Sequence, residues 1–275
     1  MWFDKGMRLL LGILLAGAAS GASVDGINIH WSTAGKGAKT VLLVHGWTGD
    51  ESVWTGQVPA LVKAKYRVIT LDLPGHGKSG APKDGKFSMD LFARAIEAVR
   101  KEAGAKRVFL VGHSMGTPVI RRYALLYPKQ TAGLVFADGV VMTAALGAPT
   151  FASFGPQFEG PNGRRNQKQF VRNMCVVTSQ EMCDKILSTS LATPLATVSG
   201  AMVALGDPAV WKEEVIDIPV LGIYADKSRL GDREVMHRVF PQLKYVEIPG
   251  TDHFLMMEKP EEFNRALLDF LHNHS

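Results

Sequence analysis

The stretch that decides the fold reads Val108-Phe-Leu-Val-Gly-His-Ser-Met-Gly-Thr117. Its apolar beginning predicts a buried strand, and a segment compatible with a helix follows it as far as Tyr127. A glycine–x–serine–x–glycine turn between a strand and a helix raises the serine hydroxyl above a sheet, and the helix N-terminus beneath it favours negative charge. We therefore predict that Ser114 is a nucleophile. The alternative is a glycine-rich turn that carries an idle serine.

Strand-like and helix-like segments alternate on both sides of this stretch. The predicted strands cover 26–32, 40–44, 66–71, 107–112, 133–138, 219–224 and 244–248, and the predicted helices cover 51–63, 88–102, 117–127 and 260–273. Such alternation predicts an α/β fold, in which a mainly parallel central sheet carries helices on both faces. A helix-period pattern suits the segment after Ser88, where four apolar residues fall on one face.

The alternation lapses between residues 139 and 214. This part of the chain has prolines, glycines, a phenylalanine cluster and helical patterns, but no convincing strand. We predict that residues 140–214 form a helical cap inserted into the chain. The α/β core then consists of residues 23–139 and 215–275.

Composition bounds the class of protein. The chain has 275 residues, of which 46% are hydrophobic and 21% charged, so the sequence can bury a large core and does not resemble a disordered chain. The formal net charge is +5, and the sequence has no block of consecutive lysines and arginines. We therefore expect no nucleic-acid partner.

The N-terminal segment has the features of a secretory signal peptide over residues 1–22. Lys5 and Arg8 precede the apolar run 9–18, and small residues follow it, so cleavage is expected after Ala18 or Ala22. This predicts export to the periplasm or the medium. The alternative is an uncleaved anchor that brings the N-terminus into peripheral membrane contact, although the apolar run is short for a membrane span.

The two cysteines, Cys175 and Cys183, leave two arrangements open. On one continuous helix a spacing of eight places them about 12 Å apart, which is too far for a disulfide. The segment 178–181 reads as a capping box, and a new helix beginning there would let the two thiols face each other across a turn. Two cysteines without a nearby histidine do not predict a metal site.

A serine nucleophile needs a general base and an acid that orients it. Active sites of open α/β sheets lie at the carboxyl ends of the strands, so the partners are sought directly after strands. Asp226 follows the predicted strand 219–224 and His253 follows the strand 244–248. We predict that His253 is the base and Asp226 the acid, in the chain order serine, aspartate, histidine. Asp138, at the end of the strand 133–138, is the alternative acid.

The negatively charged oxygen that forms during attack also needs hydrogen-bond donors. Two backbone amides suffice, one from the residue after the nucleophile and one from the loop after the first core strand. We predict that these are the amides of Met115 and Trp47, and that the indole of Trp47 lines the acyl pocket.

Five segments together resemble the serine hydrolases of the α/β-hydrolase superfamily, of the esterase and lipase kind. They are His45-Gly46-Trp47, Asp72-Leu-Pro-Gly-His-Gly-Lys-Ser79, Gly112-His-Ser-Met-Gly116, Tyr224-Ala-Asp226 and Asp252-His-Phe-Leu-Met-Met-Glu-Lys-Pro260. The resemblance covers nearly the whole chain after the predicted signal. The dehalogenases and epoxide hydrolases of that superfamily carry an aspartate where this chain has Ser114, so the resemblance argues against both chemistries.

We therefore expect an enzyme that cleaves carboxylic esters through an acyl-enzyme on Ser114, with no metal and no organic cofactor. The phenylalanines and leucines of the predicted cap suggest a small-molecule substrate with an apolar moiety. The same three residues could instead serve C–C bond, lactone or amide hydrolysis, or perhydrolysis. A non-catalytic binding module on the same fold is a further alternative.

Overall fold

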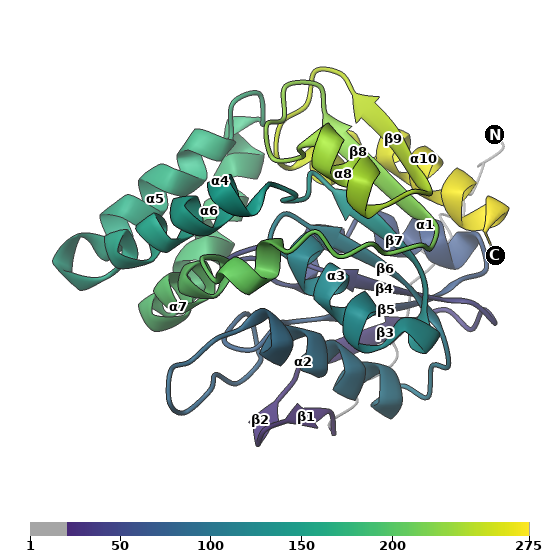
Figure 1. Cartoon of the computed structure of the whole chain (residues 1–275), viewed down its shortest axis with the longest axis horizontal. Coiled ribbons are helices and arrows are strands. Elements are labelled where there is room, and N and C mark those ends of the chain that lie inside the picture. Colours follow the sequence, from purple (N-terminus) through teal and green to yellow (C-terminus); the bar gives the residue numbers. More distant parts are fainter. Residues whose placement is uncertain (1–20, 275) are drawn as a thin grey trace, which may run out of the picture.

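A computed structural model describes residues 21–274, so the predicted signal segment lies almost entirely outside the described residues. The centre of the molecule is a seven-stranded sheet in the order β3-β5-β4-β6-β7-β8-β9 (Figure 1). Its strands are β3 (Trp31–Ala34), β4 (Thr40–Val44), β5 (Arg67–Leu71), β6 (Val108–His113), β7 (Thr131–Ala137), β8 (Val220–Ala225) and β9 (Leu243–Ile248). Only the β3–β5 pair is antiparallel in this sheet, which confirms the predicted α/β class.

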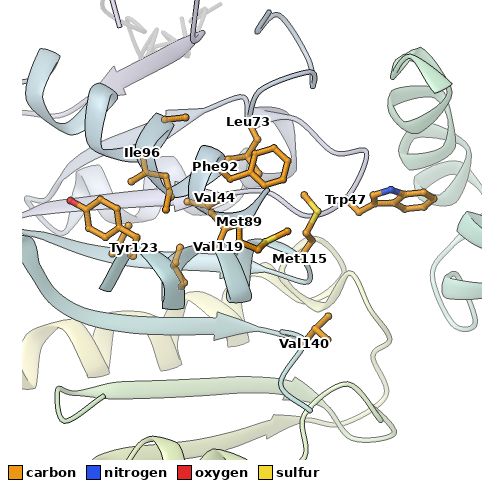
Figure 2. Close-up of a cluster of buried hydrophobic side chains, with 14 of the residues drawn as sticks. Val44, Trp47, Leu73, Met89, Phe92, Ile96, Met115, Val119, Tyr123 and Val140 are labelled. Atoms are coloured by element: carbon orange, nitrogen blue, oxygen red, sulfur yellow. The ribbon is translucent and has the colours of Figure 1, made fainter. Parts of the chain in front are cut away.

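Helices cover both faces of the sheet. The central strands β4 and β6 are therefore buried along their whole length. One face carries α2 (Met89–Glu102), α3 (Gly116–Leu126) and α8 (Arg233–Val239), and the other carries α1 (Gln57–Lys63) and α10 (Pro260–Asn273). Figure 2 shows the apolar layer under α2 and α3, with Phe92, Ile96 and Tyr123 packed towards Val44. Ser88 caps α2, because its side chain accepts a hydrogen bond from Leu91 N.

Two short strands precede the main sheet. β1 (Ser23–Val24) and β2 (Ile27–Asn28) pair antiparallel across a tight turn. Both turn residues, Asp25 and Gly26, have positive φ, which an aspartate–glycine pair tolerates better than most. These two residues therefore close a small hairpin ahead of the main sheet.

Between β7 and β8 the chain forms four α-helices that lie together beyond the carboxyl ends of the strands (Figure 1). They are α4 (Ala144–Phe154), α5 (Gly163–Met174), α6 (Gln180–Ala192) and α7 (Leu195–Leu205). We call residues 140–214 the helical insertion. Within it the structure records one short parallel bridge, between Val141 and Gly231 of the core, and otherwise only helices, turns and loops.

A break between α5 and α6 resolves the alternatives for the cysteines. Cys175 lies just after α5, Cys183 lies in the first turns of α6, and the two form a disulfide with their Cα atoms 6.0 Å apart. The cap of α6 is Ser179, whose side chain accepts from Met182 N. The predicted capping box began one residue earlier, and this was wrong because the Thr178 hydroxyl hydrogen-bonds to Asp252 instead.

Within residues 21–274 no single helix has both the length and the apolar composition to cross a membrane. The helices α6 and α7 reach that composition only as a pair, and the pair is bent by 95°. Val198, Ala201 and Met202 of α7 are buried in the apolar core, which accounts for much of that composition.

Candidate active site

The turn around Ser114 has the strained geometry that the sequence predicts. β6 ends at His113, α3 begins at Gly116, and Ser114 between them has a φ of +52°. A Cβ on Gly112 would lie 2.5 Å from the carbonyl oxygen of Gly116, so only glycine lets strand and helix approach this closely. The strain is maintained by the hydrogen bond from Ser114 N to Ala137 O, at 3.1 Å.

His253 lies beside the carboxylate of Asp138, not that of Asp226. Its Nδ1 is 2.8 Å from Asp138 Oδ2, and both side chains are buried, 9% and 3% exposed. A neutral imidazole that donates from Nδ1 to a carboxylate presents Nε2 as the proton acceptor. The predicted pairing of His253 with Asp226 is therefore wrong, and the structure brings the alternative, Asp138, to the histidine.

The two aspartates differ because their backbones turn their side chains in different directions. Asp138 has a φ of +43°, its amide donates to Ile223 O, and its Oδ1 accepts from Ala225 N at 3.2 Å. The carboxylate is thereby held inside the protein. Asp226 is exposed, and its Oδ1 accepts from Gly250 N at 3.2 Å, at the start of the loop that carries His253.

The loop after β4 passes directly against the serine. A Cβ on Gly46 would lie 2.9 Å from Ser114 Cβ, so the glycine permits this approach. Gly49 N donates to Gly46 O at 3.1 Å and closes a β-turn with Trp47 and Thr48 at its centre. The backbone of Trp47 therefore lies near Ser114, as the prediction of an oxyanion site requires.

His113 also belongs to the site, although the sequence did not single it out. Its Nε2 lies 2.8 Å from the carbonyl oxygen of His253, and the two rings are 4.6 Å apart. Burial and the nearby His253 ring lower the pKa of His113 well below its ordinary value, so the ring is neutral and Nε2–H donates to the carbonyl. His113 thus ties the nucleophile turn to the histidine loop. Its position next to Ser114 was the available signal.

Two further buried histidines support the loops. Leu73 N donates to His45 Nε2 at 2.9 Å, and His45 Nδ1 donates to Gly46 O at 2.7 Å. Burial lowers the pKa of His45, and it lowers the pKa of His76 to about 3. Both rings therefore remain neutral, and they connect the loop after β4 with the loop after β5.

Ser114 and His253 line one cavity of about 70 Å³. Its walls are mostly apolar: Trp47, His113, Met115, Val140, Phe151, Phe170, Met174, Met202, Leu205, Leu230 and Phe254 complete the lining. No lysine, arginine, aspartate or glutamate is among these described lining residues. Met115 and Trp47 both lie in the wall, so the two predicted amide donors belong to residues that surround the serine. The volume is small beside the roughly 300–1,000 Å³ of sites for drug-sized ligands.

Within the described part of the chain, no group of three or more histidine, cysteine, aspartate or glutamate side chains is arranged to hold a metal ion. The chemistry that the geometry offers is that of Ser114 in one cavity with His253, whose imidazole is oriented by the Asp138 carboxylate. A hydroxyl, an imidazole and a carboxylate in this arrangement suit nucleophilic acyl transfer.

Residues 39–260 match the family model of the alpha/beta hydrolase fold. The chain therefore belongs to the α/β hydrolase fold family, as the sequence resemblance indicated. It is a hydrolase of that family.

Relatives across the family differ in the reactions for which they are named. The chain is 27% identical to the pimeloyl-[acyl-carrier protein] methyl ester esterase of Edwardsiella ictaluri, over 90% of this chain and 98% of that protein. It is 28% identical to a 2-hydroxy-6-oxononadienedioate/2-hydroxy-6-oxononatrienedioate hydrolase of Paraburkholderia phymatum, over 89% of this chain and 91% of that one. A bromoperoxidase from Bacillus anthracis has a similar structure, with a TM-score of 0.79 and 28% identity over 90% of this chain and 96% of that one.

Proposed function

We propose that this chain is a serine esterase that hydrolyses esters of small, uncharged acyl groups through an acyl-enzyme on Ser114. The observation that carries the proposal is the 2.8 Å contact between His253 Nδ1 and Asp138 Oδ2, beside the strained turn of Ser114. A histidine oriented in this way is what a serine hydroxyl needs to become a nucleophile at neutral pH.

In the first half-reaction the Ser114 oxygen attacks the ester carbonyl carbon while His253 Nε2 takes the hydroxyl proton. The carbonyl oxygen becomes an oxyanion that the backbone amides of Trp47 and Met115 stabilise. His253 then gives the proton to the leaving alcohol oxygen, and the ester C–O bond breaks. In the second half-reaction water attacks the acyl-enzyme by the same steps, and the acid is released. Asp138 holds the imidazole in the required tautomer and stabilises its charged form.

The size and lining of the cavity support small, uncharged acyl groups. Its volume of about 70 Å³ is only a little more than twice the roughly 30 Å³ that one water molecule occupies in the liquid. Apolar walls stabilise an alkyl chain but offer a carboxylate no counter-charge. This lining also argues against the C–C bond alternative with a dicarboxylic substrate like the one for which the Paraburkholderia relative is named.

The test is a panel of chromogenic esters of increasing acyl length, with a lactone, an anilide and a dienone acid as competing substrate classes. We expect the wild type to hydrolyse acetate and butyrate esters much faster than octanoate esters and the other classes. The Ser114→Ala variant should lose at least roughly 10³-fold in kcat. Equally slow hydrolysis of all esters by the wild type and Ser114→Ala would refute the proposal. A preference for the dienone acid would contradict ester hydrolysis and favour C–C bond hydrolysis by the same residues.

We also propose that the protein is exported, as its N-terminal sequence predicts. The Cys175–Cys183 disulfide supports this, because disulfides persist in oxidising compartments and are rare in reducing ones. N-terminal sequencing of the protein recovered from the periplasm and the medium tests the proposal. A mature chain that begins after Ala18 or Ala22 is the expected result, and an intact N-terminus in the cytoplasmic fraction would contradict it.

A further inference from the structure

Thr48 adopts a backbone conformation that its side chain disfavours. Its φ is +55°, at the third position of the turn that Gly49 N and Gly46 O close. That position of such a turn is normally glycine or asparagine, and a β-branched residue with positive φ is an outlier. Strain of this kind persists only where the surroundings hold the residue in place. Thr48 directly follows Trp47, whose amide we assign to the oxyanion site.

The helical insertion holds Thr48. Its hydroxyl lies 2.8 Å from the Ser190 hydroxyl at the end of α6, and its carbonyl oxygen accepts from the Thr193 hydroxyl at 3.5 Å. All three residues are buried, at 3%, 2% and 3% exposed. Polar groups buried in this way stabilise one geometry only while they remain paired, because an unpaired member carries the full cost of desolvation.

A second layer of the insertion orients Ser190. Gln167 of α5 is fully buried, and its Nε2 donates to Ser190 O at 2.7 Å and to Ser190 Oγ at 3.0 Å. The Ser190 hydroxyl therefore accepts from Gln167 and is left to donate to Thr48. Arg164 fixes the glutamine in turn, since its Nη1 donates to Gln167 Oε1 at 2.8 Å and to Thr193 O at 2.7 Å.

The insertion also holds the side chain of Trp47. The indole Nε1 donates to Val198 O of α7 at 2.9 Å, and the ring lies 4.9 Å from Phe158 and 5.1 Å from Phe170. Figure 2 shows this indole at the end of the core cluster, pointing away from it towards helices of the insertion. Both central residues of the turn are thus attached to the insertion and not to the sheet.

We propose that the helical insertion is a structural part of the oxyanion site: Thr48, held by Ser190 and Gln167, is a positioning residue that aims the Trp47 amide at the oxyanion. The proposal rests on the proposed function. It assigns the insertion a role in the chemical step, besides enclosing the cavity. A hydrogen-bond donor aimed at the transition state must be held in place in advance, because reorientation during the reaction costs rate.

The experiment compares Ser190→Ala, Thr48→Gly and Thr48→Ser with the wild type. Ser190→Ala removes the hydroxyl partner and leaves the turn's own sequence intact. Thr48→Gly removes the same hydrogen bond but relieves the backbone strain, so it tests the contact without adding strain. Thr48→Ser keeps the hydroxyl. Ser199→Ala is the matched control, because Ser199 of α7 is a buried hydroxyl of the insertion that bonds to Glu159 at 2.8 Å and not to the turn.

The readouts are kcat and KM for a small ester, and the inhibition constant of a trifluoromethyl ketone, which forms a tetrahedral oxyanion adduct with a nucleophilic serine. We expect Ser190→Ala and Thr48→Gly to lower kcat roughly 10- to 100-fold, short of the 10²–10³ for losing a donor outright, with KM nearly unchanged. The inhibition constant should rise in parallel. Thr48→Ser should recover most of the activity, and Ser199→Ala should behave as the wild type.

Melting temperatures measured on the same samples separate positioning from simple support. If Ser190→Ala and Thr48→Gly lower the melting temperature but keep the wild-type kcat and inhibition constant, the proposal is overturned. A loss of kcat that Thr48→Ser does not share, in protein that still melts cooperatively, supports it. Fluorophosphonate labelling of Ser114 in the wild type is measured first, so failure of the proposed function is recognised independently.

Discussion

At the scale of single residues, the candidate site depends on backbone conformations that side chains alone do not reveal. Ser114 and Asp138 both have positive φ, and each sits at the carboxyl end of a neighbouring parallel strand. Aspartate tolerates this region better than most residues, because its short polar side chain can bond locally. The Asp138 carboxylate is consequently buried between β7 and β8, where His253 reaches it.

Replacing the two candidate acids separates them. Asp138→Asn keeps the shape of the side chain but no longer stabilises a charged imidazole, so we expect kcat to fall roughly 10³- to 10⁴-fold. Asp226→Asn is the matched control and should stay within about twofold of the wild type, because Asp226 is exposed. Steady-state kinetics on one small ester measures both. A larger loss for Asp226→Asn would contradict the assignment of Asp138.

The structure places Ser114 and His253 in one cavity, but it pairs the histidine with Asp138 and not with Asp226, which the sequence analysis preferred. Asp138 and Asp226 each come directly after a core strand, and these strands are neighbours in the sheet. Chain order does not separate them, since both aspartates lie between Ser114 and His253, each directly after a strand. The choice depends on the φ of Asp138 and on the bond from Gly250 to Asp226, and neither leaves a pattern in the sequence.

The walls of the cavity set the acyl length. Leu230 lines the cavity but is only partly buried, so Leu230→Ala enlarges the space at a smaller cost in stability than a core truncation. We expect the ratio of kcat/KM for hexanoate over acetate esters to rise roughly tenfold, as about two additional buried methylenes become accommodated. Leu146→Ala, at an exposed position of α4, is the control. An unchanged ratio in Leu230→Ala would contradict this lining.

At the scale of elements, a carboxyl pair connects the insertion to the histidine loop. The Asp252 carboxylate accepts from Val177 N at 2.8 Å, Thr178 N at 3.0 Å and the Thr178 hydroxyl. Glu258 of α9 (Leu255–Glu258) accepts from Asp252 N at 2.9 Å and also contacts the Thr178 hydroxyl. We call this group the carboxyl clamp. It attaches the loop between α5 and α6 to the residue that precedes His253.

Opposite shifts of the two carboxyls give the clamp a pH dependence. Burial, and then the bond to Asp252, raise the pKa of Glu258 from 4.5 to about 7. Burial opposes ionisation of Asp252, but bonds from Glu258, Val177 and Thr178 outweigh it and lower the pKa from 3.8 to about 2. The contribution of Glu258 is therefore complete below pH 4.5 and is lost as the pH rises through 7. That of Asp252 is complete above pH 3.8 and is lost as the pH falls towards 2.

A glutamine in place of Glu258 should remove the upper half of this dependence. Glutamine resembles the protonated acid at every pH. The melting temperature of Glu258→Gln should therefore fall less than that of the wild type as the pH rises from 5 to 8. We expect a difference of roughly 2 °C, kept small because the group is half exposed and screened. Glu261→Gln, at an exposed position of α10, is the control. Parallel pH profiles for wild type and Glu258→Gln would contradict the clamp.

At the scale of the whole molecule, the insertion is attached to the core at the two loops that form the site. The turn 46–49 is held through Ser190, Thr193 and Val198, and the histidine loop is held through Thr178. The sequence predicts an inserted helical segment from its lack of strands. It could not predict these attachments, because they join residues some 70 to 150 positions apart whose pairing depends on how α5, α6 and α7 pack.

The disulfide stabilises the helical insertion by restricting the conformations that the unfolded chain can adopt. It links residues eight positions apart, for which chain entropy gives roughly 2.5 kcal/mol. We expect the Cys175→Ala/Cys183→Ala variant to melt roughly 5–10 °C below the wild type. A reductant should lower the melting temperature of the wild type by a similar amount and leave the double variant unaffected. A reductant effect on the double variant as large as on the wild type would contradict this account.

The central claim is that Ser114 is an activated nucleophile, and labelling with a fluorophosphonate tests it most directly. Intact-mass spectrometry of the folded chain should find one probe adduct, and peptide mapping should place it on Ser114. The Ser114→Ala variant and heat-denatured wild type should remain unlabelled, because activation needs both the residue and the folded site. A folded wild type that stays unlabelled, or that carries the adduct on another residue, would contradict the claim.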